Sequence, residues 1–242
     1  MTRSASASRT LFLAGWILLA GCVAARSGVG LAAAQAGRFP PADRPVAPIV
    51  TPTYSTEAAR DAHAEAERVL SRLGVKSGMR VADVGAGDGY YTVRLAKRLG
   101  PGATIYAEDV VQSHLDHLAA RLARERIAGI TLVHGTPSDP RLPPQSIELA
   151  LLAHMYHEIQ QPYEFVYRLY GALATGGRVA IIDNDKPTDK HGTPPALLRC
   201  ELGAVGYREV DFLLLAPADG YLAVFAPPAA LPRPEDIRPC AR

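Results

Sequence analysis

Short apolar runs alternate with amphipathic stretches along most of the chain. The apolar runs predict strands at residues 80–84, 104–108, 130–134, 147–153 and 178–183. Apolar positions at helical spacing predict helices at residues 57–73, 91–99, 112–126 and 163–174. Strands that alternate with helices are typical of a parallel sheet covered by helices on both faces.

The pattern changes toward the C-terminus. A helix is predicted at residues 195–202, followed by two β-rich runs at 207–215 and 220–226 that only residues 216–219 separate. So short a link permits an antiparallel hairpin but no crossover helix. The predicted fold class is therefore α/β, a doubly wound sheet that is mostly parallel with one late antiparallel strand.

The first 22 residues have the order of an export signal. Arg3 and Arg9 precede an apolar run at residues 11–20, which ends at Gly21 and Cys22. The run is shorter than the roughly 20 apolar residues that a permanent membrane helix needs, so it is predicted to be removable.

Residues 19–22 also resemble the lipobox of bacterial lipoproteins, in which the cysteine is acylated and becomes the first residue of the mature protein. The resemblance implies a cell-envelope protein that faces the periplasm or the exterior and contacts the membrane through lipid on Cys22. The alternatives are a plain secretory signal, an uncleaved anchor or a cytoplasmic protein.

Composition divides the chain into four parts. We predict a signal peptide at 1–22, a flexible linker rich in Ala, Gly and Pro at 23–53, a domain at 54–227 and a Pro-rich, irregular tail at 228–242. If Cys22 carries lipid, Cys200 and Cys240 either pair in an oxidising compartment or stay as two small apolar side chains. The net charge of +2, without a long basic block, argues against nucleic acid as a partner.

A glycine-rich loop follows the first strand of the predicted domain. Residues 83–89 read Asp-Val-Gly-Ala-Gly-Asp-Gly, and glycines at alternate positions let the backbone turn sharply and approach a ligand. Dinucleotide folds have two residues between the second and third glycines, whereas this loop has one. The spacing therefore disfavours a dinucleotide-dependent oxidoreductase. An acid two residues before the first glycine, with one residue between the second and third, resembles motif I of class I S-adenosylmethionine (SAM) methyltransferases.

This resemblance extends over residues 69–226 and implies the Rossmann-like methyltransferase fold with SAM as cofactor. It implies that Asp83 meets the amino-acid end of the cofactor. Asp109, with Glu108 as second choice, ends the second strand and is expected to accept hydrogen bonds from both ribose hydroxyls. Many relatives have an acid near Thr136, so adenine recognition here is expected to use backbone or Asp139. The expected cofactor-binding residues are Asp83, Gly85, Ala86, Gly87, Asp88, Gly89, Asp109, Val110 and Thr136.

A histidine-rich segment follows the fourth predicted strand, where this family forms the floor of its methyl-acceptor site. The predicted catalytic residues are His157, Glu158 and His154, acting as acid and base partners. Two alternatives stay open: these residues only shape the pocket, or they converge with His191 as metal ligands. Asp183 and Asp185, after the fifth strand, are candidates for holding a polar acceptor.

The function that follows from the resemblance is methyl transfer from SAM to a small-molecule acceptor. The alternative is a catalytically silent, methyltransferase-like binding module of the cell envelope. SAM is made in the cytoplasm, and this supply problem keeps the binding module open for an exported chain.

Overall fold

The computed structural model describes residues 39–49, 56–215 and 220–240. The predicted signal peptide, the lipobox cysteine and residues 23–38 and 50–53 of the predicted linker lie outside the described residues. No helix within the described ranges is long and apolar enough to cross a bilayer.

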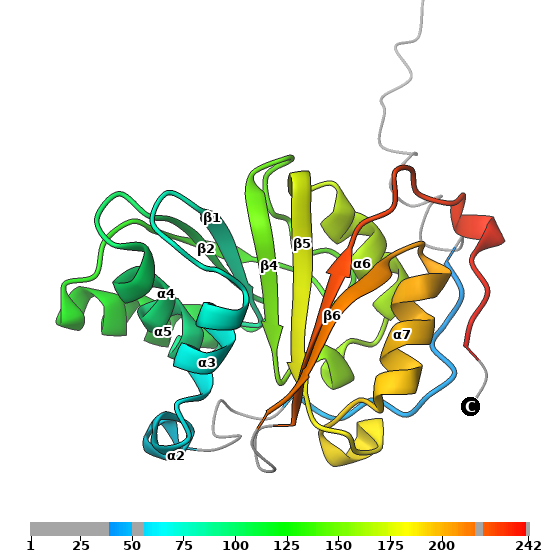
Figure 1. Cartoon of the computed structure of the whole chain (residues 1–242), viewed down its shortest axis with the longest axis horizontal. Coiled ribbons are helices and arrows are strands. Elements are labelled where there is room, and N and C mark those ends of the chain that lie inside the picture. The colour runs from blue at the N-terminus through cyan, green and yellow to red at the C-terminus, as the bar shows by residue number, and fades with distance from the viewer. Residues whose placement is uncertain (1–38, 50–55, 216–219, 241–242) are drawn as a thin grey trace, which may run out of the picture. The chain divides into compact units, whose positions relative to one another are not determined.

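Seven strands form one twisted sheet at the centre of the domain (Figure 1). The strands are β1 (Arg80–Val84), β2 (Thr104–Asp109), β3 (Ile130–His134), β4 (Ile147–Ala153), β5 (Leu173–Asp183), β6 (Arg208–Leu214) and β7 (Tyr221–Ala226). Their order is β3-β2-β1-β4-β5-β7-β6, and β7 alone runs antiparallel, pairing with both β5 and β6. The predicted fold class is confirmed.

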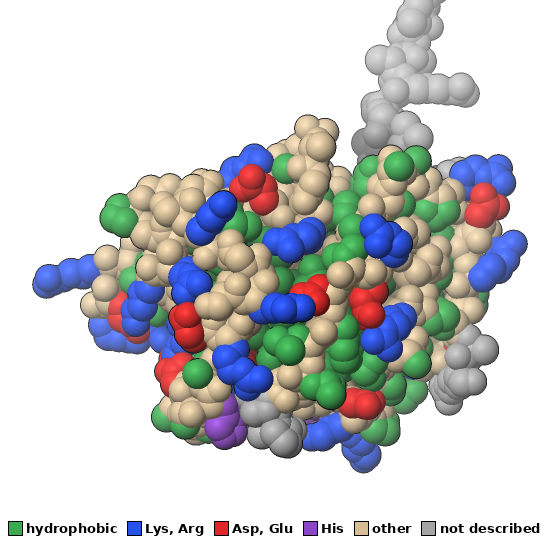
Figure 2. All heavy atoms as spheres, in the orientation of Figure 1, with side chains coloured by type: hydrophobic (Ala, Val, Ile, Leu, Met, Phe, Trp, Pro, Cys, Tyr) green, Lys and Arg blue, Asp and Glu red, His purple; other side chains and the backbone are tan. Residues whose placement is uncertain are grey.

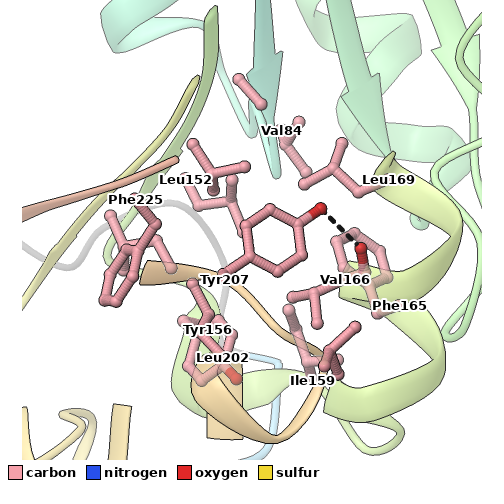
Figure 3. Packing of buried hydrophobic residues seen from close by; sticks show 14 of the residues in the cluster. Val84, Leu152, Tyr156, Ile159, Phe165, Val166, Leu169, Leu202, Tyr207 and Phe225 are labelled. Atoms are coloured by element: carbon pink, nitrogen blue, oxygen red, sulfur yellow. Dashed lines mark hydrogen bonds between the residues drawn. The ribbon is translucent and has the colours of Figure 1, made fainter. Parts of the chain in front are cut away.

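Helices cover both faces of the sheet because successive strand residues point to opposite sides. Val81 packs with α3 and α4, whereas Ala82 and Val84 pack with α6 and α7. On the second face Tyr207 lies among apolar side chains, and its hydroxyl donates to the carbonyl of Val166 at 2.9 Å (Figure 3). The helices are α2 (Glu57–Ala62), α3 (Glu65–Arg72), α4 (Tyr90–Leu99), α5 (Gln112–Glu125), α6 (Pro162–Tyr170) and α7 (Pro195–Ala204), with short 3₁₀ turns η1 (Tyr156–Glu158), η2 (Thr188–Lys190) and η3 (Pro234–Asp236).

Two helix predictions need correction. The helix expected at 57–73 is broken between α2 and α3, where Ala64 takes a left-handed conformation with φ 52°. The break turns Glu65 inward, where its carboxylate pairs with Arg60. The helix expected at 163–174 ends at Tyr170, because Leu173 already pairs with Ile147 at the start of β5.

Residues 39–49, within the predicted linker, pack against the domain. Arg44 is buried, and its Nε donates to Glu201 Oε1 at 2.8 Å. The backbone N–H of Ala47 donates to the carbonyl of His157 at 3.2 Å. We call residues 39–49 the N-terminal strap.

The described part of the C-terminal tail is irregular apart from η3. It is bound to α7 by a disulfide between Cys200 and Cys240, whose Cα atoms lie 6.0 Å apart. Of the two alternatives that the sequence leaves open, the structure has the disulfide.

Candidate functional site

A cavity of about 260 Å³ lies at the carboxyl ends of β1, β2 and β4. The order of the strands reverses between β1 and β4, and open α/β sheets bind ligands at such a switch point. Residues from the glycine-rich loop, from the end of β2, from the segment after β4 and from α2 line the cavity. The chain therefore brings most of its predicted cofactor and acceptor residues to one place.

The glycine-rich loop has positive φ angles where the cavity requires close backbone approach. Gly85 has φ 71°, and a Cβ added there would lie 2.7 Å from Met155 Cγ. The N–H of Gly87 donates to Asp109 Oδ2 at 2.9 Å, which ties the loop to the end of β2. Gly89 does not line the cavity; a side chain there would collide with Leu118, so this glycine serves the packing of α4 on α5.

Three carboxyl groups lie at the base of the loop. Burial raises the pKa of Asp83 to about 6, although its Oδ2 accepts a hydrogen bond from Thr92 Oγ1 at 2.6 Å that opposes the rise. Burial and the neighbouring charge of Asp109 raise the pKa of Glu108 well above its ordinary value. Glu108 Oε1 is buried without a hydrogen-bond partner among the described residues.

Asp109 lies in the cavity wall. Its Oδ1 accepts from the N–H of Val111 at 2.8 Å and lies 3.3 Å from His114 Nδ1, whereas its Oδ2 accepts from Gly87 and keeps a second lone pair. Asp88, Ala86, Val110 and Thr136 also line the cavity. Asp139 does not line it; its carboxylate accepts from the N–H of Arg141.

No sequence pattern indicated that α2 contributes to the site. Thr56, Glu57 and Arg60 line the cavity, and the Arg60 guanidinium lies 3.6 Å from the ring centroid of Tyr90. These placements depend on the break before Glu65, which no local pattern predicted. α2 itself buries no residue, and Glu57 pairs with Arg94 and Arg121.

The three predicted catalytic residues fall into two groups. His154 has φ 57°, and its Nε2 lies 3.5 Å from Oε1 of Glu65. Burial alone would raise the pKa of Glu65, but hydrogen bonds from His154 and Arg60 hold it well below its ordinary value. His154 thus belongs to an ionic cluster on α3.

His157 belongs to a second cluster, formed with the end of β5. Its side chain is fully buried, and Nδ1 lies 2.9 Å from Asp183 Oδ1. Asp183 also accepts from Thr193 Oγ1 at 2.7 Å and from the N–H of Asn184 at 2.9 Å. Because an ionised carboxylate only accepts, we assign the ring proton to Nδ1, so that Nε2 carries the lone pair.

Nε2 of His157 lies 4.0 Å from Glu158 Oε1, and both residues line the cavity. The ring of His191 packs edge-on against His157 with centroids 5.4 Å apart. Of the two aspartates expected to hold an acceptor, Asp183 is the buried partner of His157, whereas Asp185 is exposed and outside the cavity wall.

Residues 81–177 match a protein family described as a methyltransferase domain. The chain has the fold of the class I SAM-dependent methyltransferases. A SAM-dependent methyltransferase of Aquifex aeolicus is similar in structure, with a TM-score of 0.60 and 22% identity over 66% of this chain and 87% of that one.

Two relatives with named substrates match in sequence. Demethylmenaquinone methyltransferase of Geobacillus sp. (strain WCH70) is 21% identical over 122 residues, 50% of this chain and 52% of that protein. Trans-aconitate 2-methyltransferase of Variovorax paradoxus (strain S110) is 28% identical over 171 residues, 68% of this chain and 62% of that protein. The chain thus matches about half of the first relative's length and under two thirds of the second's.

The residues present fit SAM. Gly85 has no side chain, so the space between the loop backbone and Met155, which a Cβ would occupy, stays open. Asp109 Oδ2 keeps a lone pair that a ribose hydroxyl can use, and Glu108 Oε1, which has no hydrogen-bond partner among the described residues, belongs to a residue that also lines the cavity. Asp83 adds a carboxylate that suits a cationic ligand.

Proposed function

We propose that this chain transfers a methyl group from SAM to a small-molecule acceptor. One observation carries the proposal: a single cavity joins the glycine-rich loop and Asp109 to His157 and Glu158. SAM supplies a methyl carbon that its sulfonium has already made electrophilic. The protein's main tasks are then to align the acceptor with that carbon and to exclude water.

The chain's own residues divide these tasks. The glycine loop and Asp109 orient the cofactor from the sheet side, while Thr56, Glu57 and Arg60 of the α2 segment line the cavity from the helix side. His157, fixed by Asp183, presents Nε2 as the polar group of the acceptor side. The names of the two sequence relatives, which refer to demethylmenaquinone and trans-aconitate, support a small molecule as the acceptor.

Calorimetry tests the cofactor first. We expect the mature protein to bind SAM and S-adenosylhomocysteine, and Asp109→Asn to weaken both by about ten- to a hundredfold, the worth of a hydrogen bond to a charged group. Asp139→Asn, outside the cavity wall, is the matched control and should bind as wild type does. If neither ligand gives heat at millimolar concentration, the proposal that this chain binds SAM is refuted. Equal binding by wild type and Asp109→Asn would show that the ribose carboxylate is misassigned.

Turnover separates the enzyme from the silent binding module. Formation of S-adenosylhomocysteine is measured with a panel of small oxygen, nitrogen and carbon acceptors. We expect His157→Ala to lower turnover while SAM binding is retained. Binding of SAM by wild type with no product for any acceptor would favour the module.

We also propose that the mature protein lies in the cell envelope, anchored by lipid on Cys22. The order of charged and apolar residues in 1–22 supports export, and the disulfide between Cys200 and Cys240 supports an oxidising compartment. Because SAM is made in the cytoplasm, methyl transfer in that compartment requires SAM that has crossed the membrane.

A further inference from the structure

Two histidines on different loops each bury a ring nitrogen that has no hydrogen-bond partner within the described ranges. The atoms are Nε2 of His157 and Nδ1 of His191. Leaving a buried polar atom unsatisfied costs about 1–3 kcal/mol, so a pair of them side by side requires an explanation. A general base would use the nitrogen of His157 alone and gives His191 no role.

A carboxylate completes the group. His157, Glu158 and His191 each offer one ligand atom, and these three atoms lie within 4.8 Å of one another. Ligands of a tetrahedral Zn²⁺ ion lie about 3.3 Å apart, given metal–ligand bonds of roughly 2.0–2.2 Å. The ligand atoms must therefore move closer together to bind the ion. Rotation of the Glu158 side chain, which is partly exposed, can supply most of this movement.

The surroundings of His157 match those of a metal-ligating histidine. Such a histidine donates its other ring N–H to a carboxylate, which fixes the ring and makes the free nitrogen a better ligand. Asp183 accepts from Nδ1 of His157 in this way, and Thr193 and the N–H of Asn184 in turn fix Asp183.

The loop after β5 is folded to bring His191 to this place. His191 has φ 53°, an unusual conformation for a residue with a side chain, and such strain gathers at functional sites. A Cβ on Gly192 would lie 2.6 Å from the carbonyl oxygen of Asn184, so the chain can turn back there only with glycine. Thr188 Oγ1 donates to the carbonyl of Pro45, which fixes the loop to the N-terminal strap.

We infer that His157, Glu158 and His191 bind a divalent transition-metal ion of the Zn²⁺ type, with Asp183 as the outer-sphere partner. Two imidazoles and one carboxylate form a ligand set that zinc enzymes use while keeping a position open for water or substrate. His157 and Glu158 also line the cavity, so the ion lies on its acceptor side. Metal binding by these residues does not depend on methyl transfer.

The test is a titration of the full chain with Zn²⁺ after chelator treatment, followed by calorimetry, with Co²⁺ as a spectroscopic probe of tetrahedral coordination. We expect one ion per chain. His191→Asn, which tolerates the left-handed backbone, and Glu158→Gln should each weaken binding at least ten- to a hundredfold, the range already seen for loss of an outer-sphere partner. His117→Asn, on the surface, is the matched control and should bind as wild type does.

Three results would overturn the inference: no Zn²⁺ bound, equal binding by His191→Asn and wild type, or loss of binding in His117→Asn alone. Thermal unfolding shows which variants fold, and if His191→Asn does not, Glu158→Gln decides. SAM calorimetry on the same variants keeps this inference apart from the proposed function, because a cofactor site without the metal still binds SAM.

Discussion

At the scale of single residues, the buried carboxyl groups of the cofactor loop have consequences for stability. Asp83 is 2% exposed and sits where β1 enters the glycine-rich loop. Its pKa rises from 3.8 to about 6 on folding because burial disfavours the charged form. Between these values the folded chain binds a proton that the unfolded chain has released.

Asp83 therefore makes the fold less stable as pH rises. Stability falls with pH wherever the folded state binds more protons, so its contribution decreases from about pH 4 to about pH 6 and is constant above. The full difference is about 3 kcal/mol at 1.36 kcal/mol for each pKa unit.

We expect Asp83→Asn, whose amide oxygen can still accept from Thr92, to gain stability relative to wild type over this pH range. Urea unfolding of both proteins at pH 4.5, 5.5, 6.5 and 7.5, without cofactor, measures the difference. A difference that does not vary with pH would show that Asp83 titrates as it does in the unfolded chain.

At the scale of elements, the N-terminal strap supports the turn that carries His157. The guanidinium of Arg44 donates to the carbonyls of Tyr156, His157 and Ile159 at 3.3–3.4 Å, in addition to its ion pair with Glu201. Tyr156 donates from its hydroxyl to the other oxygen of Glu201 at 2.9 Å. The strap, η1 and α7 thus share one buried polar network.

Removal of Arg44 should be costly because it leaves a buried charge on Glu201. We expect Arg44→Met to lower the free energy of unfolding by about 3–5 kcal/mol, as for other broken buried pairs. Arg72→Met is the matched control, since the side chain of Arg72 is half exposed in its pair with Asp211 and such pairs contribute about 0–1 kcal/mol. Equal losses in the two variants would contradict this role of the strap.

At the scale of the whole molecule, the described surface carries mixed charge. On the face in Figure 2, Lys and Arg side chains are spread out and several lie beside Asp or Glu. Arg72 and Asp211 form one such pair on the surface of the domain. The disulfide between Cys200 and Cys240 spans 40 residues and binds the tail to α7. A disulfide of this kind persists in an oxidising compartment.

We expect protein expressed from its full gene to fractionate with membranes, and Cys22→Ala to lose that association. In the membrane-bound protein, Cys200 and Cys240 should resist alkylation until a reductant is added, as mass spectrometry can show. Reduction should lower the free energy of unfolding by about 2–4 kcal/mol. Recovery in the soluble cytoplasm, or free alkylation of both thiols, would contradict the envelope proposal.

Local patterns in the chain were sufficient to predict the strands of the sheet. Strands at 130–134 and 147–153 coincide with β3 and β4, and the short link after residue 215 indicated the antiparallel β7. Alternation, helical spacing and glycine positions are local properties, since they follow from the geometry of consecutive residues. The same reasoning located Gly85, Gly87 and Asp109 in the cavity wall.

Only the tertiary structure decided which residues each histidine of the site contacts. His154 joined Glu65, while His157 joined Asp183, 26 residues away, and His191. Arg44 reached Glu201 across 157 residues from a segment whose composition indicated a linker. Such contacts join residues that no local period relates, so they are set by how the packed elements meet and by the need to satisfy buried charge.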